Sequence, residues 1–400
     1  MKLVVFAHIP PPHHGQSYMV KLMLDGFGGD ARRAPIPQSQ SVQCYHVNSR
    51  YSESMDDIGE MRCGKFLLVL KYCLEAIWCR IRYGAATLYY VPAPGKRSAL
   101  YRDWVVFLLC RPFFKRIILH WHAVGLGDWL ASEGSLLERW ITRLLFARPS
   151  ASIPLAIASM RDALWFGSRK VTIVPNGIPD PCPDFDTALL PLRHARIEAR
   201  RRLLCGEPGA NAEEAAVFRV LYIAHCTRDK GVFDALEGIA LFNQRKDRRG
   251  LRAHLTVAGS FLCKEEERAF QKRIAQPDLE GAVTYAGFVK GEEKVALFKT
   301  NDALCFPTFY RAEGQPVNLI EAMAFGLAVV TTRWRAIPEI LPPDYPGFVD
   351  PQQPAQIADV LEWLVVLDAA ETLRKRYLEQ FSEQSHLEQL RTAILSLVAK

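Results

Sequence analysis

Short apolar runs alternate with longer amphipathic segments along almost the whole chain. In residues 1–180 the short runs predict four strands, at 3–7, 87–91, 117–122 and 170–174. The longer segments predict four helices, at 17–28, 65–83, 100–110 and 136–146. Segment 65–83 has the strongest helical pattern, formed by Leu67, Leu70, Leu74, Ile77 and Ile81. Repeated β-α units of this kind predict a parallel sheet with helices on both faces.

The same alternation resumes after residue 216. Strands are expected at 217–223, 254–258, 283–286, 303–306 and 328–332, with helices between them. Residues 178–216 lack the alternation and contain a run of arginines between 193 and 202, which we interpret as a solvated linker helix. The expected fold class is therefore α/β, with two Rossmann-like domains facing across a cleft. The boundaries we expect are an N-terminal domain at 1–180, a linker at 181–215, a C-terminal domain at 216–375 and a last helix at 376–400 that crosses back to the first domain.

Composition excludes several classes of protein. Hydrophobic residues make up 49% and charged residues 23% of the chain, which is typical of a globular protein and not of a disordered, collagen-like or coiled-coil one. No stretch approaches the roughly 18 uncharged apolar residues that a membrane-spanning helix needs. The ten cysteines form no C-x-x-C pair, which indicates reduced thiols in a cytoplasmic protein rather than a disulfide framework or a zinc site.

Positive charge is concentrated in the first half of the chain. Residues 1–180 contain 22 Lys+Arg against 13 Asp+Glu, whereas the formal net charge of the whole chain is +7. This asymmetry predicts that one domain meets an anionic surface. No nucleic-acid recognition motif is present, so the inner face of a membrane with anionic lipids is the candidate partner. Segment 111–116, together with Trp104 and Phe107, forms either a membrane-interface patch or a core helix followed by a solvated turn.

The segment Glu313-Gly-Gln-Pro-Val-Asn-Leu-Ile-Glu321-Ala-Met-Ala-Phe-Gly326 carries the clearest chemistry. Pro316 fits the first position of a helix and Gly326 fits the residue just past its end. The N-terminus of this helix, at 315–318, offers unpaired N–H groups and a partial positive charge to a phosphate. Glu313 precedes the helix and Glu321 lies within it, so the two carboxylates address different parts of one extended ligand.

This string, followed by Ile337-Pro338-Glu339, resembles the family-four retaining glycosyltransferases of GT-B fold. Further segments resemble the members that build bacterial surface polysaccharides. They are Pro10-Pro11-Pro12-x-x-Gly15-Gln16-Ser17, Tyr90-Val91-Pro92-x-Pro94, Tyr101-Arg102-Asp103, His120-x-His122, Val174-Pro175-Asn176-Gly177-Ile178 and Asp229-Lys230-Gly231.

The resemblance implies two catalytic residues. Glu313 would steady the positive charge that develops at the anomeric carbon of the donor sugar, and His122 would lie near that sugar. His120 and His122 would point to one side of a strand, but no third ligand is in sight, so we expect no metal. The resemblance also implies no other cofactor.

The remaining implied residues bind a nucleotide-sugar donor. Glu321 would accept hydrogen bonds from the ribose hydroxyls, and Gly15 would let the first loop approach the β-phosphate. Lys230 and the amides of Val317, Asn318 and Leu319 would hold the diphosphate, and the backbone near Phe288 and Val289 would meet the base.

Two departures from the family pattern concern the donor. Many members have Gly-Arg where this chain has Ala224-His225, so Arg228 or a protonated His225 would replace the missing arginine. Relatives often have a glycine where Arg335 stands, so Trp334 and Arg335 would shape a different donor pocket.

The function we expect is retaining transfer of a sugar from a nucleotide-sugar to a lipid-linked or oligosaccharide acceptor in cell-surface polysaccharide biosynthesis. The site of action would be the cytoplasm, or its side of the cell membrane. Two alternatives stay open: a sugar-nucleotide epimerase of the same fold, and a non-catalytic nucleotide-sugar-binding subunit.

Overall fold

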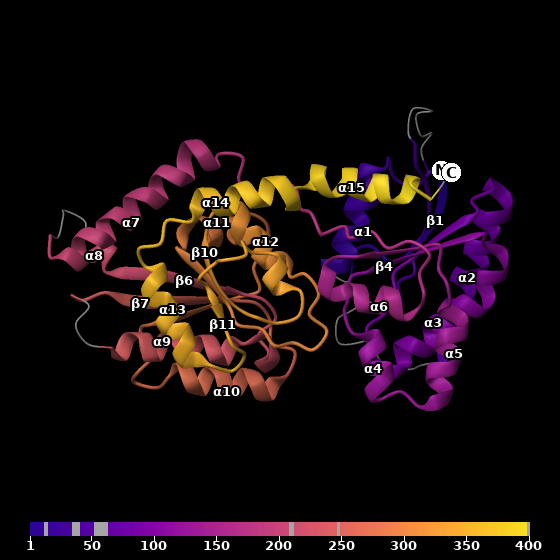
Figure 1. The fold of residues 1–400 in the computed structure, drawn as a ribbon. Coiled ribbons are helices and arrows are strands. Elements are labelled where there is room, and N and C mark those ends of the chain that lie inside the picture. The colour runs from indigo at the N-terminus through magenta and orange to yellow at the C-terminus, as the bar shows by residue number, and fades with distance from the viewer. Residues whose placement is uncertain (12–14, 34–40, 52–62, 208–211, 246–248, 398–400) are drawn as a thin grey trace. The chain divides into compact units, whose positions relative to one another are not determined.

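The computed structural model describes residues 1–11, 15–33, 41–51, 63–207, 212–245 and 249–397, with only the backbone at 63–65 and 212. The chain forms two compact units (Figure 1). The first unit comprises Met1–Gly177, Ala312–Gln315 and Glu383–Lys400, and the second comprises Ile178–Arg311 and Pro316–Ser382.

The first unit is built on a five-stranded parallel sheet. Its strand order is β2 (Gln43–Val47), β1 (Lys2–Phe6), β3 (Thr87–Tyr90), β4 (Arg116–Trp121) and β5 (Ala151–Pro154). Both faces of β1 are buried, since Val4 packs into one core and Leu3 into the other. The strand predicted at 170–174 was wrong, because Val171 makes only an isolated bridge to Ser152.

Helices cover both faces of this sheet. Helices α1 (Gly15–Gly26) and α15 (Glu383–Leu395) contribute to one core. Helices α2 (Cys63–Tyr83), α3 (Arg97–Cys110) and α5 (Leu136–Phe146) contribute to the other. The short helices α4 (Leu126–Ser132) and α6 (Met160–Trp165) complete the unit.

Helix α2 confirms the helix predicted at 65–83, but its large apolar residues face outward. Leu67, Leu74 and Ile81 are exposed, although they recur at helical spacing. The buried positions are filled by smaller side chains, namely Val69, Cys73, Ala76 and Cys79. The core face of α2 is therefore narrower and made of smaller residues than its hydrophobic pattern suggests.

The second unit is built on a six-stranded parallel sheet. Its strand order is β11 (Phe348–Val349), β10 (Ala328–Thr332), β9 (Ala303–Phe306), β6 (Val217–Ile223), β7 (Arg252–Ala258) and β8 (Val283–Gly287). The chain starts this sheet at β6, continues to β7 and β8, and then crosses to β9 on the other side of β6. The strand order thus reverses between β6 and β9, and the carboxyl ends of these two strands form the topological switch point, where such sheets bind ligands.

The helices of the second unit follow the predicted alternation. They are α9 (Val232–Gln244), α10 (Lys264–Ile274), α11 (Gly291–Thr300), α12 (Val317–Ala324), α13 (Pro354–Leu364) and α14 (Ala370–Arg376). Ahead of β6 lie α7 (Leu190–Cys205) and the short α8 (Ala212–Ala215).

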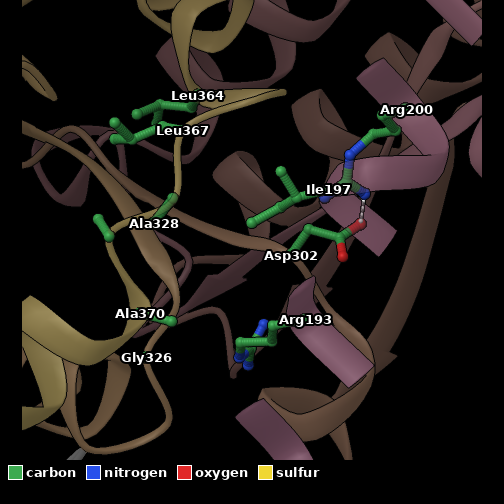
Figure 2. A pocket seen from close by; sticks show the side chains of 10 residues that line it. Arg193, Ile197, Arg200, Asp302, Gly326, Ala328, Leu364, Leu367 and Ala370 are labelled. Atoms are coloured by element: carbon green, nitrogen blue, oxygen red, sulfur yellow. Dashed lines mark ion pairs between the residues drawn. The ribbon is translucent and has the colours of Figure 1, made fainter. Parts of the chain in front are cut away.

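Helix α7 contradicts the expected solvated linker helix. It belongs to the second unit, and two of its arginines are buried. Arg193 donates three hydrogen bonds, to the backbone oxygens of Phe325, Asn301 and Phe298, at 2.8–3.0 Å. Arg200 pairs with Asp302 at 3.0 Å and donates to the Val365 oxygen (Figure 2). Because Phe325, Asn301 and Val365 are C-cap residues of α12, α11 and α13, the basic run of α7 satisfies the ends of helices in its own unit.

Segment 111–116, considered with Trp104 and Phe107, combines core residues with exposed ones, since Pro112, Phe113 and Lys115 are exposed. Phe107 and Phe114 are buried, and the Trp104 indole donates to the Thr142 hydroxyl at 2.9 Å. Arg111 donates to the backbone oxygens of Leu145 and Ala147. Of the two interpretations of 111–116, the structure supports the core helix followed by a solvated turn, because α3 ends at Cys110 and the exposed residues come after it. None of the described helices is long and apolar enough to cross a membrane.

Candidate active site

Three sequence motifs meet within the first unit. The Asn176 backbone N–H donates to Gln315 Oε1 at 2.6 Å, and Asn176 Nδ2 donates to the Gln315 oxygen at 3.1 Å. A Cβ at Gly314 would lie 2.4 Å from the carbonyl oxygen of His122, so only glycine fits there. Glu313, one residue earlier, is only 7% exposed. The segment Ala312–Gln315 is thus fixed between the Pro-Asn-Gly motif and the end of β4, which places Glu313 in the same unit as His122.

His122 follows β4 and lies beside a second histidine. The rings of His120 and His122 have centroids 4.1 Å apart, and His120 Nδ1 is hydrogen-bonded to the Tyr89 hydroxyl. Burial holds the pKa of His120 well below its ordinary value, and the charges of His122 and His386 act in the same direction. His120 is therefore neutral at neutral pH. Among the described residues, no group of three His, Cys, Asp or Glu side chains is arranged to hold a metal.

Buried histidines make the stability of the first unit depend on pH. Burial lowers the pKa of His46, His120 and His386, and each makes a hydrogen bond through one ring nitrogen. A histidine with a lowered folded-state pKa binds fewer protons when folded than when unfolded. Its contribution is therefore complete above the ordinary pKa of about 6.5 and is lost as the pH falls below that value.

We therefore expect the melting temperature to fall steadily as the pH is lowered from 7.5 to 5.5. Each histidine contributes at most about 1.4 kcal/mol per pH unit to the loss. The His386→Gln variant, which can still donate to the Pro175 oxygen, should show a shallower slope in the same thermal-melt series. A melting temperature that is flat across this range in the wild-type protein would contradict the prediction.

Helix α12 supplies the predicted N-terminus in the second unit. It starts at Val317, one residue later than the sequence suggests, because Pro316 is its extended N-cap. Gly326, at φ 61°, lies just past its end as predicted. Asn318 Nδ2 donates to the Ile223 oxygen at 2.9 Å, which ties the first turn of α12 to the carboxyl end of β6. The amides of Val317, Asn318 and Leu319 therefore lie at the switch point of the sheet.

Glu321 lies in the second unit and has a partner that the sequence analysis missed. Lys294 Nζ of α11 donates to Glu321 Oε1 at 2.6 Å. This ion pair orients the Glu321 carboxylate through Oε1. Nothing in the sequence marks Lys294, because it stands 27 residues earlier in an ordinary helical segment.

The loop that carries Lys230 is locked to the loop after β9. Gly231 has φ 82°, and a Cβ there would lie 2.3 Å from the Pro307 oxygen. The Phe309 N–H donates to the Asp229 oxygen at 2.8 Å. Lys230 Nζ lies 4.4 Å from the centre of the Tyr310 ring, a cation–π contact that the sequence analysis also missed. Lys230 and the start of α12 therefore come from loops that follow neighbouring strands, β6 and β9.

The structure distinguishes His225 from Arg228, the two residues expected to replace the missing phosphate-binding arginine. Burial, and then the charge of Lys230, hold the pKa of His225 below its ordinary value, so His225 is neutral at neutral pH. The guanidinium of Arg228 lies 4.5 Å from the centre of the Phe233 ring. Of the two residues, Arg228 is the cation available to this loop.

The other predicted donor residues lie at loops and a helix start. Phe288 is exposed and Val289 is partly buried between β8 and α11, and Gly15 is the exposed first residue of α1. Arg335 has φ 51°, in the left-handed region that favours glycine, which agrees with the glycine that the family resemblance implies at this position. Trp334 Nε1 donates to the Tyr310 oxygen at 2.8 Å. This hydrogen bond ties the Trp334 loop to Tyr310, the residue whose ring contacts Lys230 Nζ.

Two units, each built on a parallel sheet and one with a helix N-terminus at its switch point, are the architecture of the GT-B glycosyltransferase fold. HepE of Anabaena, solved with UDP and also with UDP-glucose, is 16% identical in the UDP complex, with a TM-score of 0.64 over 99% of this chain and 100% of HepE. Sucrose-phosphate synthase from Thermosynechococcus elongatus is 16% identical, with a TM-score of 0.67 over 100% of both chains. At such identity the likeness shows the fold, and the expected GT-B fold is confirmed.

Residues 209–382 match the model of the family described as glycosyl transferases group 1. The amylovoran biosynthesis glycosyltransferase AmsK of Erwinia amylovora is 32% identical over 142 residues, which are 34% of this chain and 33% of AmsK. The chain thus matches this relative over about a third of its length. The resemblance to glycosyltransferases that we inferred from the sequence is thus confirmed over residues 209–382.

Proposed function

We propose that this protein is a retaining glycosyltransferase that moves a sugar from a nucleotide-sugar to a lipid-linked saccharide in cell-surface polysaccharide biosynthesis. The observation that carries the proposal is the switch point of the second unit, where Lys230 and the N-terminus of α12 follow the neighbouring strands β6 and β9. A diphosphate is the ligand that such a pairing of a lysine with free helix amides favours. The family match over 209–382 and the name of AmsK support the reaction class and the polysaccharide context.

In the proposed reaction the bond between the anomeric carbon and the phosphate oxygen breaks. The acceptor hydroxyl oxygen bonds to that carbon on the same face, and its proton passes to the leaving phosphate. Lys230 and the amides of Val317–Leu319 stabilise the negative charge that develops on the diphosphate. Glu313 stabilises the positive charge at the anomeric carbon, with His122 beside the donor sugar.

The donor is held through its nucleoside. Glu321, oriented by Lys294, accepts hydrogen bonds from the ribose hydroxyls. The backbone at Phe288 and Val289 meets the base, and Gly15 approaches the β-phosphate. UDP-sugars are the first donors to test, because HepE, which has a similar fold, was solved in complex with UDP and with UDP-glucose.

We expect no metal or other cofactor, since cationic and N–H groups of the chain neutralise the diphosphate. The enzyme would work in the cytoplasm, peripherally on the inner face of the membrane.

The test is a panel of nucleotide-sugars incubated with the protein, with and without a bacterial lipid extract. We expect release of nucleoside diphosphate only when donor and lipid are both present, together with a lipid product heavier by one sugar. The Lys230→Met variant should lower this release by about one to two decades, because a charge-assisted hydrogen bond contributes about 1.5–3 kcal/mol.

Other outcomes would replace the proposal. Conversion of the nucleotide-sugar without any acceptor would identify an epimerase. Binding of donor with no turnover under any acceptor condition would identify a non-catalytic binding subunit.

A further inference from the structure

Helix α5 buries polar side chains and exposes apolar ones. Its buried residues are Glu138, Thr142 and Phe146. Its exposed apolar residues are Leu136, Leu137, Trp140 and Leu144, at 82%, 64%, 63% and 61% exposure. A surface helix of a globular protein normally has the opposite arrangement, with its apolar stripe toward the core. The outward side of α5 therefore suits contact with a medium less polar than water.

Hydrogen bonds hold α5 in this orientation. Ser135 and Glu138 form a capping box, and the Tyr101 hydroxyl donates to Glu138 Oε1 at 2.7 Å. These bonds, first of all that from the Ser135 N–H, lower the pKa of Glu138 to about 2. Because turning the apolar side inward would break this set and the Trp104–Thr142 bond, the exposure of the leucines is fixed by the fold.

The apolar surface continues across the neighbouring helices. Helix α5 packs against α3, and α3 packs against α2, so all three cover the same face of the sheet (Figure 1). The outward residues of α2 include Leu67, Leu74, Trp78 and Ile81, at 66%, 67%, 50% and 71% exposure. Leu108 of α3, at 65% exposure, is the corresponding residue of the middle helix. We call the exposed residues named here on α2, α3 and α5 the outer face.

The positive charge around the outer face indicates an anionic partner. Residues 63–148 contain 13 Lys+Arg against 5 Asp+Glu. Two of those acids, Asp103 and Glu138, are buried. Lys71, Lys115 and Arg143 are exposed on or next to these helices. A second copy of the same basic face would be repelled, whereas tryptophans and leucines flanked by Lys and Arg suit the headgroup level of an anionic bilayer.

We propose that the outer face docks on the surface of an anionic lipid bilayer. Trp78, Trp140 and the leucines lie at headgroup depth, and the exposed lysines and arginines face the lipid phosphates. This docking deepens the proposed function by naming the surface that reaches a lipid-linked acceptor, but it is measured without donor or acceptor.

The experiment is co-flotation of the full chain with vesicles of phosphatidylcholine, alone or mixed with phosphatidylglycerol. We expect binding to the mixed vesicles that weakens as salt is raised, and little binding to phosphatidylcholine alone. The double variant Trp140→Ser/Leu144→Ser should bind at least about tenfold more weakly, since it removes two of the inserted side chains. The matched control is Trp363→Ser/Leu262→Ser, which removes a tryptophan and a leucine that are 75% and 51% exposed in the second unit. The control should bind vesicles as the wild type does.

Several results would overturn the docking surface. They are no binding of the wild type to mixed vesicles, equal loss in both double variants, or unchanged binding of the α5 variant with circular dichroism intact. A dimer in sedimentation that the α5 variant abolishes would assign the outer face to a second copy instead. If vesicle binding fails while acceptor-dependent release in detergent persists, the docking surface is wrong and the proposed function stands; the reverse pattern overturns only the proposed function.

Discussion

Replacing Glu313 by Gln is expected to lower the rate of sugar transfer by about two to three decades. The side chain is buried and its neighbours are fixed, since Gly314 lies against the His122 carbonyl and Gln315 is hydrogen-bonded to Asn176. Gln keeps the shape of Glu but removes the negative charge that stabilises the positive charge developing at the anomeric carbon. Steady-state kinetics should therefore show the loss in kcat, while calorimetry shows nucleoside diphosphate binding nearly unchanged.

The matched control is Glu321→Gln, eight residues along the same segment. This carboxylate lies in the second unit and pairs with Lys294, so the variant should weaken nucleoside diphosphate binding by about tenfold and affect kcat less. The two variants together separate a charge used in the reaction from a charge used in binding. Full turnover in Glu313→Gln, or loss of nucleotide binding in that variant, would remove Glu313 from the reacting centre.

The fold and the α12 site could be predicted because their signals are local. Each β-α unit is defined by apolar runs of strand length and by segments of helical period, and the two sheets follow from their order. The helix at 317–324 is marked by Pro316 and Gly326 at its ends, and both lie within one residue of the expected positions. Where a strand was wrong, at 170–174, the chain runs beside β5 and makes only one bridge.

The features that the sequence did not indicate depend on partners far along the chain. Lys294 is recognisable only once Glu321 lies beside it, and Tyr310 only once Lys230 lies over its ring. The stripe of α2 has a helical period whichever side it faces, so the period alone could not assign Leu74 to the surface. A hydrophobic pattern therefore predicts a helix more securely than it predicts what covers the helix.

Replacing Arg193 by Leu is expected to destabilise the second unit by about 3–5 kcal/mol. Burial lowers the pKa of Arg193 to about 10, so the guanidinium remains charged at neutral pH. Its three carbonyl partners, at Phe298, Asn301 and Phe325, close the ends of α11 and α12 (Figure 2 shows the side chain among its neighbours). Leu fills much of the same space but donates nothing, so three buried oxygens lose their partner. Urea unfolding followed by circular dichroism, with proteolysis to assign the unit that opens, measures the effect.

Arg202→Leu is the control on the same helix. Arg202 is 60% exposed at its side chain and forms a surface ion pair with Glu198 one turn earlier, so its loss should change stability by no more than about 0.5 kcal/mol. If α7 were the solvated linker that its composition suggests, the two substitutions would have equal and small effects. A large effect confined to Arg193→Leu would mean that α7 is part of the second unit's structural core. Arg193 would then stabilise the C-terminal end of α12, the helix whose N-terminus is proposed to bind the diphosphate. Equal midpoints for the two variants would contradict that role.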